Sequence, residues 1–224
     1  LSKLFSDKDI SNEGLPFMGY MEADLFGIPA RIFRISFSGE LAYEINVASD
    51  FGTFMWEKTI EQGQQFNIQP YGTEALSNLR IEMGHVAGPE LDGRTIPYDV
   101  SLEGLVSKKK DFVGKRSLNR KAFTSSTRQR VVGLVPIDKK TVIPEGSHLV
   151  KDAKAKLPNP KLGHISSSCW SVEYNNPFAL AILQNGKNMI GEKLYAFSPL
   201  QNKTIPVEIV SSHYVDSKGE RVRS

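Results

Sequence analysis

The sequence predicts an α+β protein, in which an antiparallel sheet with helices is followed by a small antiparallel β-barrel domain. Near the amino terminus the residues alternate with the period of two that half-buried strands show. Two segments with helical spacing follow, and the order strand–strand–helix–helix is typical of α+β folds. In the second half, short apolar segments are separated by Gly, Pro and Asn, which favours many short strands.

Two strands are predicted first, at Met18–Phe26 and Ala30–Phe37. The second strand alternates cleanly, with Ile32, Arg34 and Ser36 on one side and Phe33, Ile35 and Phe37 on the other. Ser38–Glu40 has the composition of a turn, and Ala42–Val47 is the next predicted strand. A long β-hairpin is the natural assembly of these segments.

Two helices are predicted after the strands. The first covers Phe51–Gln62, with an N-cap at Ser49-Asp50 and an end near Gly63. The second begins at Thr73, which can cap it, and ends at Gly84. Its expected inner face consists of apolar residues, namely Ala75, Leu76, Leu79, Ile81 and Met83.

The pattern changes after a short predicted helix at Lys115–Phe123 and the polar stretch Thr124–Gln129. We therefore expect one domain over residues 1–125 and a second over residues 126–224. Either a barrel or a sandwich fits the second. Its predicted strands are Arg130–Pro136, Ser147–Val150, Leu162–Ser167, Phe178–Leu183, Lys193–Ala196 and Thr204–Val210.

Composition narrows the class of protein. Of 224 residues 40% are apolar and 24% charged, with a net charge of +3, which is ordinary for a globular protein. No apolar run approaches the length of a membrane span, and no nucleic-acid-binding signature occurs. Neither a membrane nor a nucleic acid is therefore expected as a partner. Leu1–Ile10 has no signal-peptide pattern, and the single Cys169 fits a reducing, cytoplasmic location. A chain that opens on Leu1 is expected to be a fragment of a longer protein.

The usual catalytic signatures are missing. The sequence has no Gly-x-Gly-x-x-Gly, no Walker loop and no Gly-x-Ser-x-Gly. Its four histidines are far apart without the spacing of metal ligands, so no metal site is expected; they are His85, His148, His164 and His213. Cys169 has no neighbouring His or basic residue to lower its pKa, which favours a structural thiol.

Several polar residues stand in unusual places. Glu44 lies inside a predicted strand, where a carboxylate faces solvent or needs a hydrogen-bonding partner. Arg80 lies among apolar residues of a helix. It is either an ordinary surface charge or a planar hydrogen-bond donor for a carboxylate or a ring edge. The basic residues Lys108, Lys109, Lys110 and Lys115 form either a solvated face or a site for an anionic ligand tail.

Together, these segments resemble the aminomethyltransferase family of the glycine cleavage system. The resemblance covers nearly the whole chain in order and spacing. The matching blocks are Arg34–Ile45, Tyr71–Leu76 with Leu79–Gly84, Lys110–Lys115 and Gly163–Ser168. Further details resemble the alpha subunits of sarcosine oxidases, namely Asp9–Glu13, Pro16–Gly19 and Val106–Phe112.

The resemblance implies a tetrahydrofolate-binding part of such an alpha subunit, with the family's folate-binding fold followed by its barrel. By family pattern Glu44 matches the carboxylate that accepts hydrogen bonds from the pterin, Arg80 matches a folate-contacting arginine, and Tyr43 lines the pocket. If folate binds, the four lysines are expected to hold a polyglutamate tail or else to form a solvated face or a subunit contact with the flavoprotein. No catalytic residue is expected here, because the family's aspartate lies upstream, and no match is found for the tyrosine that often follows the arginine helix.

By the same resemblance, sarcosine would be demethylated to glycine, with transfer of one carbon to tetrahydrofolate as 5,10-methylene-tetrahydrofolate or release of formaldehyde. Flavin and NAD would bind elsewhere in a complex with beta (flavoprotein), gamma and delta subunits, so the chain alone is expected to be inactive. Three alternatives remain open: a stand-alone aminomethyltransferase, a dimethylglycine dehydrogenase-like folate domain, and a non-catalytic domain that braces a flavoprotein.

Overall fold

The computed structural model describes residues 4, 8–154 and 156–224, so part of the segment Leu1–Ile10 scanned for a signal peptide lies outside it. The chain forms two compact units. Unit 1 consists of residues 1–76 and 218–224, and unit 2 of residues 77–217. The boundary proposed between residues 125 and 126 stays a prediction.

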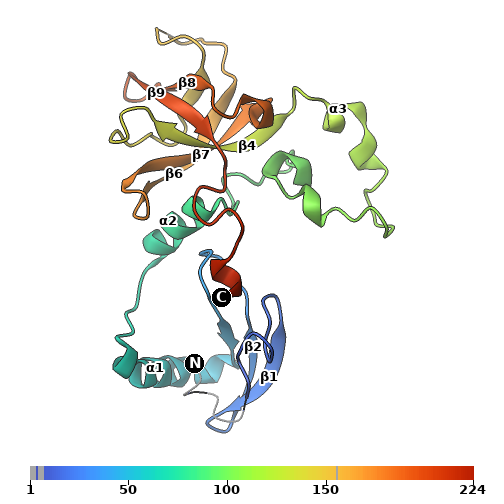
Figure 1. The fold of residues 1–224 in the computed structure, drawn as a ribbon, viewed down its shortest axis with the longest axis vertical. Helices are drawn as coiled ribbons and strands as arrows, with labels where there is room; N and C mark the ends of the chain where they lie inside the picture. Colours follow the sequence, from blue (N-terminus) through green and yellow to red (C-terminus); the bar gives the residue numbers. More distant parts are fainter. Residues whose placement is uncertain (1–3, 5–7, 155) are drawn as a thin grey trace. The chain divides into compact units, whose positions relative to one another are not determined.

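Unit 1 contains a three-stranded antiparallel sheet of β1 (Tyr20–Leu25), β2 (Ile28–Phe33) and β3 (Glu44–Asn46) in that order (Figure 1). Phe26 and Gly27 form the two-residue loop between β1 and β2, and both have positive φ, at 56° and 81°. That geometry matches the twist of a hairpin, as predicted. All three strands are shorter than predicted.

Helices follow the sheet in unit 1. A 3-10 helix η1 (Ser49–Phe51) leads into α1 (Gly52–Gly63), followed by η2 (Gln64–Phe66). The predicted N-cap is wrong, because the residues Ser49 and Asp50 belong to η1 and no side chain caps α1. The core of unit 1 lies under one face of the sheet and includes Leu15, Leu25, Ile28, Ile32 and Met55.

The carboxy-terminal end of the chain completes unit 1, through η7 (Arg221–Arg223) and Ser224. Buried Arg34 donates hydrogen bonds to the side-chain oxygen of Asn12, to the carbonyl of Leu15 at 3.1 Å and to the carbonyl of Ser224 at 2.7 Å. Arg34 therefore ties the first and last segments of unit 1 together.

The helix α2 (Thr73–Met83) runs across the division between the units. The prediction for its inner face is partly wrong, because its most buried residues are Arg80, Ile81 and Glu82, while Ala75 is exposed. Ile81 lies in the part of α2 that belongs to unit 2, and it packs with Phe178, Leu180 and Ile182 of the same unit. The carboxy-terminal turn of α2 therefore buries two charged side chains beside one apolar anchor.

A long irregular segment precedes the barrel of unit 2. It contains η3 (Pro97–Val100), η4 (Glu103–Leu105), η5 (Ser117–Asn119) and the single turn α3 (Lys121–Thr124). The predicted helix at Lys115–Phe123 is wrong, since that stretch is divided between η5 and α3. Arg120, between the two, is extended, with ψ at 141°.

Six strands of unit 2 close into an antiparallel barrel, which settles the choice between barrel and sandwich and confirms the α+β class (Figure 1). The strand order is β4-β7-β6-β5-β8-β9, with η6 (Gly186–Met189) before β8. Alternate residues fill the interior, including Leu134, Leu149 and Val207. The strands are β4 (Gln129–Pro136), β5 (His148–Val150), β6 (Gly163–Ser171), β7 (Asn176–Gln184), β8 (Lys193–Ser198) and β9 (Lys203–Val210).

Candidate functional site

Arg80, a predicted ligand-binding residue, is held by a buried ion pair in unit 2. Its guanidinium donates to Glu90 Oε2 at 3.0 Å, to Ser167 Oγ at 2.8 Å and to the carbonyl of His85 at 3.4 Å. The side chains of Arg80 and Glu90 are only 7% and 0% exposed. The pair therefore joins α2, the segment that follows it and strand β6.

Glu90 has its carboxylate oxygens satisfied from several directions. Ser167 Oγ donates to Oε1 at 2.6 Å, and the backbone N–H of Ala87 donates to Oε2 at 2.9 Å. Burial by itself would raise the pKa of Glu90, but hydrogen bonds from Ser166, Ser167 and Ala87 and the charge of Arg80 together lower it. Glu90 is therefore a charged group in a site built to hold it.

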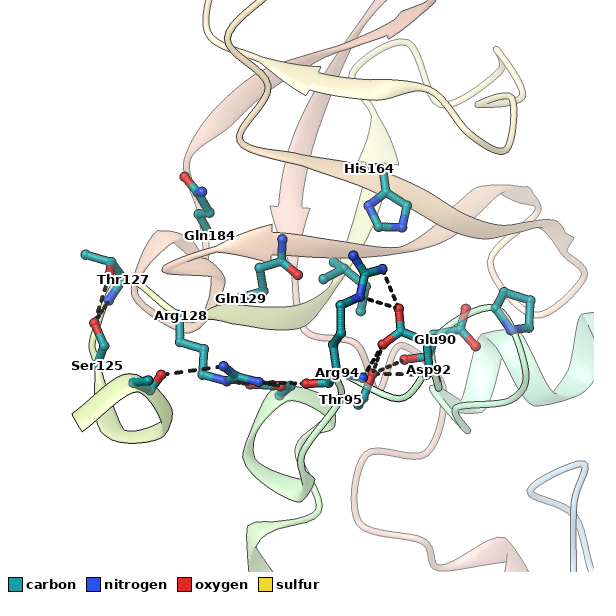
Figure 2. Close-up of a pocket in the computed structure, with 14 residues that line it drawn as sticks. Glu90, Asp92, Arg94, Thr95, Ser125, Thr127, Arg128, Gln129, His164 and Gln184 are labelled. Atoms are coloured by element: carbon teal, nitrogen blue, oxygen red, sulfur yellow. Dashed lines mark hydrogen bonds and ion pairs between the residues drawn. The ribbon is translucent and has the colours of Figure 1, made fainter. Parts of the chain in front are cut away.

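A cavity of about 540 Å³ lies beside this ion pair, and Glu90 is part of its lining. Figure 2 shows the strand residues Gln129, Gln184 and His164 on one side and Asp92 and Arg94 on the other. Asp92 and Arg94 form an ion pair with each other, in which Arg94 Nε donates a hydrogen bond to Asp92 Oδ2 at 3.0 Å. Hydrogen bonds from Arg94 lower the pKa of Asp92 to about 2.

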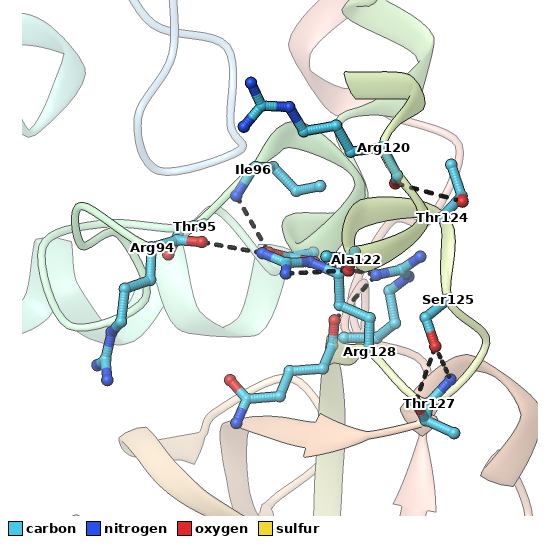
Figure 3. A network of polar contacts seen from close by, with 12 residues as sticks. Arg94, Thr95, Ile96, Arg120, Ala122, Thr124, Ser125, Thr127 and Arg128 are labelled. Atoms are coloured by element: carbon cyan, nitrogen blue, oxygen red, sulfur yellow. Dashed lines mark hydrogen bonds and ion pairs between the residues drawn. The ribbon is translucent and has the colours of Figure 1, made fainter. Parts of the chain in front are cut away.

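A second ion-pair network forms another part of the cavity lining. Asp99 accepts a two-pronged contact from Arg128, with both distances at 2.6 Å, and one from Arg130 at 3.0 Å. Arg128 also donates to the carbonyl of Arg94 at 2.9 Å (Figure 3). The guanidinium of Arg128 lies over the ring of Phe123. The cavity is thus framed largely by charges that already have partners.

Glu44 begins β3 in unit 1 and is exposed. It lies opposite Phe33 of β2, and Phe33 lies opposite Tyr20 of β1, so the three side chains rise in one row from one face of the sheet. Tyr43 instead packs against the core of unit 1, and its hydroxyl donates to the carbonyl of Ile10 at 3.3 Å. Glu44 and Tyr43 therefore have different surroundings.

The predicted basic group lies in unit 2. Lys108, Lys109 and Lys115 line a hollow of about 830 Å³ that also has apolar walls, and Lys110 is exposed beside it. The ammonium of Lys115 donates to the carbonyls of Lys110 at 2.6 Å and Lys108 at 3.4 Å. Lys115 therefore shapes this loop, while the other three lysines extend from it.

Cys169 is buried in β6. Burial, helped by the nearby charge of Glu82, raises the pKa of its thiol to about 12. Since the thiolate is the reactive form of cysteine, this environment agrees with the structural role predicted for Cys169. In the part of the chain that the structure describes, no group of three or more His, Cys, Asp or Glu could hold a metal ion, and no helix is long and apolar enough to cross a membrane.

Sequence reasoning missed Glu90 and Ser167, the partners of Arg80. They lie 10 and 87 residues away from it, so no local spacing points to them. The available signal was Arg80 itself, together with Glu82, because both stand between apolar residues of one helix. A charged residue in that setting calls for a buried partner.

Comparison with known proteins agrees with this architecture. Residues 1–110 match the family model of the GCVT N-terminal domain, and residues 129–216 match that of the glycine cleavage T-protein C-terminal barrel domain. A crystal structure of the glycine cleavage system aminomethyltransferase T from Bartonella henselae superposes with a TM-score of 0.72 at 22% identity. The match covers 92% of this chain and 54% of that one, and it concerns the fold alone.

Curated relatives match over most of this chain. The sarcosine oxidase subunit alpha of Rhizobium meliloti (strain 1021) is 40% identical over 220 residues, which are 96% of this chain and 22% of that protein. The aminomethyltransferase of Chloroherpeton thalassium is 29% identical over 87% of this chain and 51% of its own length. The chain thus spans about a fifth of the sarcosine oxidase subunits and half of the aminomethyltransferase. It belongs to the glycine cleavage T-protein family and is similar along nearly its whole length to sarcosine oxidase alpha subunits.

Proposed function

We propose that this chain is the tetrahydrofolate-binding part of a sarcosine oxidase alpha subunit. The observation that carries the proposal is the 40% identity to such subunits over 96% of the chain. Identity to the aminomethyltransferase is lower, at 29% over 87% of the chain, so a stand-alone transferase is the second candidate. In the favoured function, sarcosine yields glycine and its one-carbon unit passes to tetrahydrofolate or leaves as formaldehyde.

The residues of unit 1 have the chemistry that a pterin requires. The amino-pyrimidine edge of a pterin offers adjacent N–H donors, for which a carboxylate is the matching acceptor. Glu44 is an exposed carboxylate beside the aromatic ring of Phe33. In this proposal Glu44 accepts those hydrogen bonds. Tyr43, which directly precedes β3, holds the start of that strand in place by packing in the core of unit 1 and by its hydrogen bond to the carbonyl of Ile10.

Arg80 has a more constrained part in the proposal. Of the five N–H donors of its guanidinium, three hydrogen-bond to His85, Glu90 and Ser167 within the described residues. Up to two donors are left for a ligand, and their direction is set by the buried pair with Glu90. Glu90 is therefore a positioning residue for Arg80.

Tetrahydrofolate supplies the nitrogen that accepts the one-carbon unit. The residues of this chain bind and orient the pterin, so that binding energy is used to position the reacting groups. Flavin and NAD belong to other parts of the assembly, with the beta, gamma and delta subunits as partners. The complete assembly is therefore needed for turnover, and the isolated chain should release no glycine from sarcosine.

The lysine hollow suits the anionic tail of a polyglutamylated folate. Lys108, Lys109 and Lys110 carry exposed charges, and an anionic tail gains from them without strict geometry. Replacing these three residues with Gln should reduce the affinity difference between long and short tails, most clearly at low salt. A constant difference together with weaker subunit association would instead assign the lysines to an interface.

The experiment that tests the proposed function is calorimetric titration of the complete protein with tetrahydrofolate. Glu44→Gln removes the charge that accepts the N–H pair and should weaken binding about 10- to 150-fold, the equivalent of about 1.5–3 kcal/mol for a charged hydrogen bond. Glu57→Gln changes an exposed carboxylate of α1 and is the matched control. Unchanged affinity in Glu44→Gln would reject the proposed role of this residue.

A further inference from the structure

The three-stranded sheet of unit 1 has one core face and one open face. Along β1, β2 and β3 the residues alternate strictly, so that Ala23, Ile32 and Ile45 face the core. The opposite face carries Tyr20, Phe33 and Glu44 in one row across the three strands. This open face combines two aromatic rings with a carboxylate.

The aromatic rings of this row are already paired. Tyr20 and Phe33 stack with their ring centroids 5.7 Å apart and an angle of 24° between the ring planes. Even so, Tyr20 is 64% exposed, and Phe33 is only partly buried. Phe33 is directly opposite Glu44, and the Cβ atoms of such cross-strand neighbours are about 5 Å apart. A flat apolar platform thus ends at a carboxylate.

The next row of the same face adds polar groups. Glu22, Arg31 and Asn46 are cross-strand neighbours, two residues along each strand from the first row. They help to line a hollow of about 660 Å³. A ligand on the first row would therefore have space and hydrogen-bonding groups beside it, while its ring lies on Tyr20 and Phe33.

We propose that Tyr20 and Phe33 form a stacking platform that selects a planar heterocycle whose adjacent N–H donors pair with Glu44. The inference rests on the proposed function and deepens it by naming the residues that recognise the ring rather than its hydrogen-bonding edge. Offset stacking on an aromatic side chain favours flat π-systems, and the carboxylate at the end of the row then requires N–H donors on the ring edge. A ring that lacks such an edge would gain binding energy from stacking on the platform but none from hydrogen bonds to Glu44.

The test is calorimetric titration of the complete protein with two probes. Tetrahydrofolate reports binding of the whole ligand, and 6-methyltetrahydropterin reports the ring alone. Tyr20→Ala and Phe33→Leu remove one ring each, and both should raise the Kd of either probe at least about fivefold, the lower end for loss of one stacking contact. Tyr20→Phe keeps the ring and should restore the affinity to within about twofold of the unaltered protein.

The matched control is Tyr71→Ala, which removes another tyrosine of unit 1 with almost the same exposure, 63% against 64% for Tyr20. It should leave both Kd values unchanged, and circular dichroism should show the same fold in all variants. If Tyr20→Ala and Phe33→Leu bind both probes normally while Glu44→Gln binds weakly, the platform is wrong and the proposed function stands. If the unaltered protein binds neither probe, both are wrong.

Discussion

Removal of the Glu90 carboxylate should strongly destabilise unit 2. Glu90→Ala takes away the acceptor for Arg80, Ser167 and the N–H of Ala87 and leaves the Arg80 guanidinium buried without its counter-charge. Loss of one partner from a buried ion pair costs about 3–5 kcal/mol. A protein of this size loses about 2–4 °C of Tm per kcal/mol, so the transition of this unit should fall by roughly 6–20 °C.

The assays are thermal unfolding for the change in Tm and urea unfolding for the change in free energy, both read by circular dichroism, with an exposed ion pair as control. Lys187 and Glu103 are 3.0 Å apart, but their side chains are 73% and 44% exposed, so Glu103→Ala should cost about 1 kcal/mol or less. Arg80→Leu combined with Glu90→Leu should cost less than the sum of the two single changes, because no charge is left unpaired. Equal costs for Glu90→Ala and Glu103→Ala would refute the reasoning.

Three further outcomes are expected. Burial lowers the pKa of His85 and His164 below the usual 6.5, so the unfolded chain binds protons at a higher pH than the folded chain does. The stability that these residues give above about pH 6.5 should therefore be lost as the pH falls through their folded pKa values. Urea unfolding of His164→Gln should depend less on pH than that of the parent protein. Cys169, with a pKa raised to about 12, should react with a thiol reagent only at the rate of unfolding, whereas rapid labelling of native protein would contradict its burial. Asp99→Ala leaves Arg128 and Arg130 without their shared acceptor and should cost about 3–5 kcal/mol in urea unfolding.

The sheet and barrel strands follow from local patterns, but their assembly does not. Strand periodicity is a property of neighbouring residues, so the hairpin of β1 and β2 could be predicted. Barrel closure depends on the pairing of β4 with β9, where Gly133 lies opposite Val210. Nothing local to either segment encodes that contact. Lys115–Phe123 failed as a helix because it lacks an apolar stripe that could pack on a core.

The candidate site was only partly predictable for a similar reason. The residue types of Glu44 and Arg80 are unusual in a strand and among apolar helix residues, but they also fit surface charges. The resemblance to the family was needed to select them as candidate folate-binding residues. The partners of Arg80 could not be predicted, since only the fold brings Glu90 to it as an ion-pair partner and Ser167 as a hydrogen-bond acceptor. Arg34 was expected in the same strand as Ile32, but β2 ends at Phe33. The burial of Arg34 beside the carbonyl of Ser224 required a contact between residues 190 positions apart.

The contact between Arg34 and Ser224 has a consequence for the order of events during synthesis. Unit 1 includes residues 218–224, which leave the ribosome after all of unit 2 has been made. At about 5–20 residues per second, the guanidinium of Arg34 waits roughly 10–40 s for the carbonyl that it binds in the finished fold. Unit 2 is continuous in sequence and can complete its barrel in that interval. Synthesis of unit 1 thus begins before that of unit 2, but its contact between Arg34 and Ser224 can form only after unit 2 has been made.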